Sequence, residues 1–170
     1  MKKLMNGAQM KRIDVYSIQE VGIPSLVLME RAALCVTEAV LEKIKKTDKV
    51  LCVCGSGNNG ADGMAVARQL TERGISAEVY TTAEEGKGTE ELNRQRAILQ
   101  KLGIVFVNDI PAGEYNCIID AVFGIGLSRT ITGRYEQIIE KINAAKDTGS
   151  LIVAVDTPSG INAGDGQVMG

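Results

Sequence analysis

Short apolar runs alternate along the chain with longer stretches in which apolar residues recur every three or four positions. The short runs predict strands, because each is apolar and bounded by turn residues: Val50–Cys54, Ala77–Thr82, Ile104–Val107, Cys117–Ala121 and Leu151–Asp156. The longer stretches predict helices: Gln9–Glu20, Pro24–Lys46, Ala61–Arg73, Glu90–Leu102 and Tyr135–Ala145. Gly74, Gly103 and Gly149 follow three of these helices, where a left-handed C-terminal cap is needed.

This alternation predicts an α/β fold in which a mainly parallel sheet carries helices on both faces. We expect a three-layer, Rossmann-like, doubly wound sheet with strand order 3-2-1-4-5, because crossover connections are right-handed. In that order the chain reverses direction between the first and fourth strands, and ligands bind at the carboxyl ends of such strands. The loops after Cys54 and Ile119 are therefore expected to face each other across one crevice.

Composition narrows the possible functions without selecting one. The 170 residues fit a single domain spanning 1–170, with no internal repeat or linker. A formal net charge of -2 gives no basic surface for nucleic acid, and no apolar run is long enough to cross a membrane. Met1–Lys3 are not followed by the apolar stretch of a signal peptide, so we expect a cytoplasmic protein.

Histidine is absent from the chain, which excludes a Ser-His-Asp triad, a Cys-His dyad and the usual imidazole metal sites. Acid–base chemistry must then use carboxylates, lysine, tyrosine, cysteine or water. The cysteines are Cys35, Cys52, Cys54 and Cys117, and a spacing of two puts Cys52 and Cys54 on one face of a strand. Because this spacing suits neither a redox pair nor a zinc site, we interpret all four as reduced core residues.

Three glycine-containing loops follow predicted strands, and each carries at least one carboxylate. They read GSGNNGADG (55–63), DAVFGIGLSRTITG (120–133) and DTPSG (156–160). In the first loop, Gly55, Gly57 and Gly60 fit the G-x-G-x-x-G pattern of phosphate-binding turns, which by itself is a weak signal. Three such loops at neighbouring strand ends favour a ligand site.

The polar residues of these loops also have purely structural interpretations. Asn59 fits the N-cap of the following helix, and Asp62 fits a capping partner three residues later. Asp120 and Asp156 are typical of residues that end strands, and Pro158–Gly160 is typical of a bare turn. Two acids at neighbouring strand ends shift the balance towards a site.

Four motifs together resemble the NAD(P)H-hydrate epimerase family, the YjeF N-terminal domain. They are GSGNNGADG, DAVFGIGL, DTPSG and, near the start, VYSIQEVGIPSLVLMERAA. The resemblance runs from about Met10 to the end of the chain. Ala61 stands where the family has a glycine in NNGGDG, and Ile125 where it has a threonine in FGTGL. Because the family's domain usually continues further, we expect 1–170 to lack its C-terminal strands.

The resemblance implies an isomerase that interconverts the R and S epimers of hydrated NADH and NADPH, which carry a hydroxyl on C6 of the nicotinamide ring. It also implies a partner in cofactor repair, an NAD(P)H-hydrate dehydratase that acts on the S form, either separate or fused C-terminally. The implied substrate-binding residues are Asn58, Asn59, Gly60, Ala61, Asp62, Gly124, Ile125, Gly126, Leu127, Ser128, Arg129, Thr130 and Asp156. The implied potassium (K+) ligands are Asn59, Asp120 and Ser159, whose oxygens suit a hard cation.

The C6 carbon of the hydrate is a hemiaminal, which inverts by losing and regaining water or by ring opening and closure. Either route needs a group that gives and takes a proton. Without histidine, Asp156 is the first choice for this catalytic group and Asp62 the second. Two other hypotheses remain: a non-catalytic scaffold of the same fold, and a plain nucleotide-binding module that prefers intact NAD(P)H.

The N-terminal helices are candidates for a homodimer interface. Leu26, Leu28 and Met29 would form an apolar patch if they were exposed, and such patches mark interaction sites. The alternative, equally supported by the sequence, is that this helix packs on the core.

Overall fold

A five-stranded, all-parallel sheet with the order β3-β2-β1-β4-β5 organises the protein, which confirms the expected topology. The computed structural model describes residues 5–170, so the charged start at Met1–Lys3 lies outside the described residues. The strands are β1 (Lys49–Cys54), β2 (Ser76–Thr81), β3 (Phe106–Val107), β4 (Cys117–Ala121) and β5 (Leu151–Ala154). The helices are α1 (Gly7–Gln19), α2 (Ser25–Leu41), α3 (Asn58–Glu72), α4 (Glu90–Lys101) and α5 (Arg134–Asp147).

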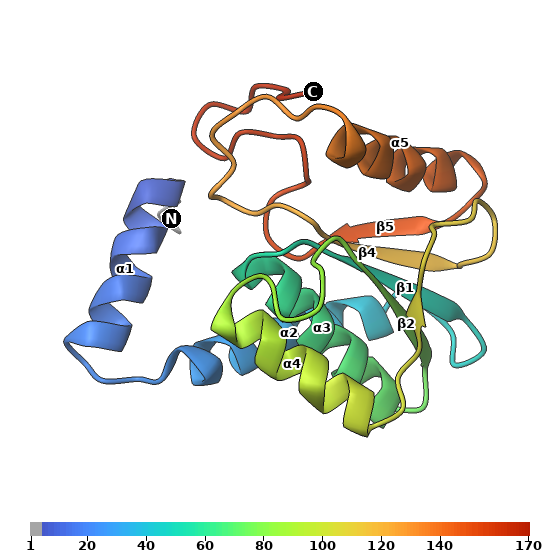
Figure 1. Ribbon diagram of the computed structural model, residues 1–170, viewed down its shortest axis with the longest axis horizontal. Coiled ribbons are helices and arrows are strands. Elements are labelled where there is room, and N and C mark those ends of the chain that lie inside the picture. Colours follow the sequence, from blue (N-terminus) through green and yellow to red (C-terminus); the bar gives the residue numbers. More distant parts are fainter. Residues whose placement is uncertain (1–4) are drawn as a thin grey trace.

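The helices form layers on both sides of the sheet, with α2, α3 and α4 on one side and α5 on the other (Figure 1). Strand β1 supplies both cores by alternation: Val50, Cys52 and Cys54 face α3, whereas Leu51 and Val53 face the α5 side. Because both faces are covered, the strand is apolar and buried from Val50 to Cys54, as is typical of parallel sheets.

Three of the four cysteines behave as predicted. Cys52, Cys54 and Cys117 are buried, and burial raises the pKa of each thiol, so they stay protonated core residues. The prediction is wrong for Cys35, which is exposed. It lies on the side of α2 opposite to the buried residues Met29 and Ala33.

Several element boundaries differ from the sequence prediction. Helix α2 ends at Leu41 instead of Lys46, because the Asp48 carboxylate accepts a hydrogen bond from the Lys45 backbone N–H (2.9 Å) in a separate turn. Strand β3 keeps only two of its four predicted residues. Helix α3 begins at Asn58 rather than Ala61, so the second half of the glycine loop is helical.

Helix α1 stands apart from the layers (Figure 1) and has no buried residue. Its exposed apolar side chains include Met10, Ile13, Val15 and Tyr16. By contrast, Met29 of α2 is buried in the core, so the core alternative is correct for that residue. Among residues 5–170, no helix is both long and apolar enough to cross a membrane.

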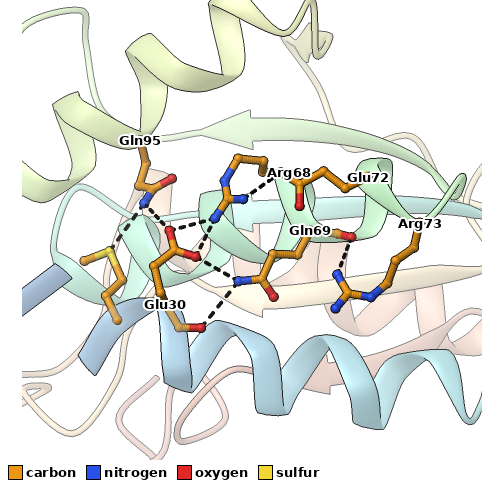
Figure 2. A network of polar contacts seen from close by, with 7 residues as sticks. Glu30, Arg68, Gln69, Glu72, Arg73 and Gln95 are labelled. Carbon is orange, nitrogen blue, oxygen red and sulfur yellow. Dashed lines mark hydrogen bonds and ion pairs between the residues drawn. The ribbon is translucent and has the colours of Figure 1, made fainter. Parts of the chain in front are cut away.

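A polar network joins α2, α3 and α4 (Figure 2). The Glu30 carboxylate of α2 accepts hydrogen bonds from Arg68 (2.6 and 2.5 Å), Gln69 (3.0 Å) and Gln95 (3.2 Å). Burial raises the pKa of Glu30, but the hydrogen bonds and charge of Arg68 and the two glutamine bonds outweigh it, so the pKa is lowered. The network fixes α3, which carries part of the site.

We predict that Glu30→Gln lowers the free energy of unfolding at pH 7 by about 1–2 kcal/mol, allowing for the partial exposure of Glu30. A lowered pKa in the folded state stabilises the protein above the unfolded-state pKa, and this contribution is lost as pH falls through the folded value. Urea unfolding should therefore show a larger deficit at pH 7 than at pH 3.5. Glu90→Gln, which removes an exposed ion pair with Arg94, is the control and should cost less than about 0.5 kcal/mol.

Candidate functional site

The loops that follow β1, β4 and β5 line one cavity of about 690 Å³, here called the main cavity. Gly124 shows how close they lie: a Cβ on this residue would stand 2.6 Å from the Asp156 Oδ2 atom and 3.3 Å from the Asn59 Cγ atom. The cavity lies at the carboxyl ends of β1 and β4, where the strand order reverses. The expected crevice is confirmed.

Most of the sequence-predicted substrate residues line the main cavity: Asn58, Asn59, Asp62, Gly124, Ile125, Gly126, Leu127, Ser128, Arg129 and Asp156. Three do not. Gly60 and Ala61 are buried in α3, and Thr130 borders a second, smaller cavity. Of the three predicted potassium ligands, Asn59 lines the main cavity, whereas Asp120 and Ser159 do not.

At two glycines of the first loop, neighbouring backbone segments lie too close for a side chain. A Cβ on Gly55 would collide with the carbonyl oxygen of Val122, and one on Gly60 would collide with the carbonyl oxygen of Gly55. Around Gly57, in contrast, no atom lies within 4 Å of the position of a Cβ. Only Gly57 leaves the backbone open towards a ligand.

Asn59 is not the N-cap of α3. Gly57 occupies that position and makes no side-chain capping bond, so Asn59 lies in the first turn of the helix. Its Nδ2 atom is buried without a hydrogen-bond partner among the described residues. Burying an amide N–H without a hydrogen-bond partner costs free energy. An unpaired amide beside a cavity is therefore typical of a ligand-binding group.

Asp62 lies one turn further along α3 and faces the main cavity. Burial raises its pKa to about 7, and the charges of Asp156 and Asp14 add to the shift. A carboxyl group with this pKa exists in both protonation states near neutral pH. It is therefore suited to give and take a proton.

Asp156 lies two residues beyond the end of β5 at Ala154, whereas the sequence predicted it as the last residue of that strand. Its Oδ2 atom accepts a hydrogen bond from the backbone N–H of Ile125 (2.8 Å). This bond crosses from the loop after β5 to the loop after β4. It gives the carboxylate a fixed orientation at the wall of the main cavity.

Hydrogen bonds join Asp120, near the end of β4, to Ser159 in the loop after β5. The Ser159 hydroxyl donates to the Asp120 Oδ1 atom (2.5 Å), and the Ser159 backbone N–H donates to Oδ2 (2.8 Å). The hydroxyl oxygen also accepts from the Phe123 backbone N–H (2.9 Å). Burial raises the pKa of Asp120 despite these bonds, which lower it. The interpretation of Pro158–Gly160 as a bare turn is therefore wrong.

Sequence reasoning assigned no site role to Met10 or Asp14, which also line the main cavity. They are four residues apart on α1, which places both on one side of the helix. That spacing was visible in the sequence, but nothing in it indicated which side of α1 meets the site. Asp14 brings a third carboxylate to the cavity beside Asp62 and Asp156.

Fold and site together define a doubly wound α/β domain whose ligand cavity lies where the strand order reverses. Within this class, the family model described as "YjeF-related protein N-terminus" matches residues 25–170 of the chain. The protein therefore belongs to the YjeF-related N-terminal family.

Curated relatives span nearly the whole chain. A protein of Limosilactobacillus fermentum named NAD(P)H-hydrate epimerase is 41% identical over 171 residues, covering 99% of this chain and 80% of the relative. One of the same name from Oenococcus oeni is 40% identical over 168 residues, covering 98% and 79%. Among solved structures, the yeast protein YNL200c has a TM-score of 0.84 at 24% identity, covering 95% of this chain and 72% of that one, which supports the fold.

We predict that Asp62→Asn stabilises the folded protein, and more at pH 8 than at pH 5. Because the folded-state pKa of about 7 lies above the unfolded value, wild-type stability falls as pH rises from about 4 to about 7. The amide removes this cost, which should raise the free energy of unfolding at pH 8 by about 1–3 kcal/mol after allowance for solvent access.

Urea unfolding at both pH values measures this effect. Glu140→Gln, on the exposed side of α5, removes the same charge and should change stability equally and slightly at pH 5 and pH 8. A gain from Asp62→Asn that does not depend on pH would contradict the raised pKa.

Proposed function

We propose that the protein is an NAD(P)H-hydrate epimerase, an isomerase that interconverts the R and S forms of hydrated NADH and NADPH. The observation that carries this proposal is that Asp62 of α3 and Asp156 of the loop after β5 line the same cavity, where the charge of Asp156 helps to raise the pKa of Asp62. Relatives of that name at 41% and 40% identity, which match 99% and 98% of the chain, support it.

The chemistry of the hydrate agrees with this site. When C6 loses its hydroxyl as water, the ring becomes an iminium cation, and water added to the opposite face gives the other epimer. Departure of water needs a proton donor, and the return needs a base. Asp156, held by the Ile125 N–H, is our first choice for this proton transfer. Asp62 is the second, and carboxylates around the ring stabilise the cation.

Asp156→Asn tests the assignment. We expect the rate of epimerisation to fall by about 10²–10⁴-fold, the usual worth of a positioned acid–base group, with the fold retained. The assay follows purified R-hydrate through an S-specific dehydratase, with the spontaneous reaction subtracted. Asp165→Asn is the control, because Asp165 is exposed and lies outside the cavity wall. Turnover of Asp156→Asn near the wild-type rate would remove Asp156 from the mechanism.

A potassium ion held by Asn59, Asp120 and Ser159 is a further part of this proposal. Amide, carboxylate and hydroxyl oxygens suit a hard cation, and among residues 5–170 no group of three or more histidine, cysteine, aspartate or glutamate residues offers a metal site. The unpaired Asn59 amide fits, because exchanging its oxygen and nitrogen would place a carbonyl oxygen in the buried position. A bound cation would supply positive charge to an acidic cavity.

We predict that KCl raises the melting temperature by several degrees relative to LiCl at equal ionic strength, because an ion that binds only the folded state stabilises it. Asn59→Ala should abolish the difference between the two salts. Asn58→Ala should keep it, because Asn58 is exposed and lies outside the predicted potassium set. Equal melting temperatures of the wild type in both salts would refute the potassium site.

The scaffold and nucleotide-binding hypotheses predict different results in the same assay. A scaffold gives no acceleration of epimerisation, and a plain nucleotide module binds intact NAD(P)H at least as tightly as the hydrate. The cavity-facing carboxylates Asp62 and Asp156 favour the enzyme over both. Action beside a dehydratase in the cytoplasm and assembly into a homodimer belong to the same proposal. The exposed apolar residues of α1 offer one surface for dimerisation.

A further inference from the structure

We propose that a second cavity beside the main one binds the adenosine half of the dinucleotide, so that one substrate molecule spans both cavities. This inference rests on the proposed function. The second cavity, here called the side cavity, measures about 290 Å³, less than half of the main cavity's 690 Å³. It lies between the loop after β4 and the start of α5.

The two cavities share a wall. Phe123, Leu127 and Arg129 border both of them, so the two cavities lie side by side along the loop after β4. A dinucleotide has the matching form, because two ring systems are joined through a diphosphate. Each cavity then takes one ring system.

The charges of the lining residues determine which half of the substrate lies in which cavity. The main cavity is lined by the carboxylates of Asp14, Asp62 and Asp156. Among the described residues that line either cavity, Arg129 is the one lysine or arginine, and it lies at the shared wall. The diphosphate is repelled by the acids and attracted by Arg129, so it belongs at this wall. The uncharged hydrated ring, which becomes cationic during the reaction, belongs beside the carboxylates.

The side cavity has the chemistry of a nucleoside site. The rings of Phe123 and Tyr135 lie 5.0 Å apart at 48° and both border it, which offers an aromatic surface to a purine. Hydroxyls of Thr130 and Thr132 offer hydrogen bonds to ring nitrogens or ribose. Stacking on an aromatic side chain tolerates any base, so the aromatic pair contributes affinity and the threonines orient the base.

The test compares two substrates, the hydrate of NADH and the hydrate of reduced nicotinamide mononucleotide, which lacks the adenosine half. Thr132→Trp fills the side cavity from an exposed position and leaves the core unchanged. We expect KM for the dinucleotide hydrate to rise about 5- to 100-fold, in line with the loss of a stacked base. KM for the mononucleotide hydrate, and kcat for both, should stay within about twofold of the wild type.

Tyr135→Ala should show the same selectivity, with Tyr135→Phe close to the wild type because the ring is kept. Tyr16→Ala is the matched control, since Tyr16 is exposed on α1 and borders neither cavity. Equal changes of KM for the two substrates, or no change for either in Thr132→Trp, would overturn the proposal.

A binding measurement separates this inference from the proposed function. Calorimetric titration with AMP should show weak binding to the wild type and at least tenfold weaker binding to Thr132→Trp. If the wild type accelerates epimerisation of neither hydrate, the proposed function fails. If AMP binds both proteins equally, the adenosine site alone is wrong.

Discussion

The site depends on one close approach of two backbones, where the loop after β1 packs against the loop after β4. Gly55 meets the carbonyl oxygen of Val122, and Gly60 meets that of Gly55, with no space for a side chain at either glycine. This contact lets α3 begin directly above the sheet, so Asn59 and Asp62 face the cavity instead of solvent. The three-helix network around Glu30 then holds α3 in this position.

The topology could be predicted because its signals are local. A strand buried on both faces is a continuous apolar run, and β1 has that form; glycines such as Gly74 and Gly103 have the positive φ angles expected after helices. Boundaries were less predictable where tertiary contacts decide them. Helix α3 starts at Asn58, where the Gly60 backbone packs closely against Gly55, and β3 consists only of Phe106 and Val107, the two residues that pair with β2.

Part of the site could also be predicted, because it follows from the positions of the strand ends. Parallel strands bring their carboxyl ends to one edge, so the side chains of Asp120 and Asp156 could be assigned to that edge from sequence alone. The position of Asp14 could not, because α1 buries no residue and its own pattern does not specify what it packs against. The hydrogen bonds between Asp120 and Ser159 could not be predicted either, because they join the end of β4 to the loop after β5, two segments that are far apart in the sequence.

Helix α1 contributes Met10 and Asp14 to the cavity wall while burying none of its own residues. An element with so few buried contacts separates from the rest at a much lower free energy than the core needs to unfold. Binding competence and global stability are therefore distinct properties of this chain. Substitutions in α1 therefore reach the cavity wall through Met10 and Asp14 without removing a side chain from the buried core.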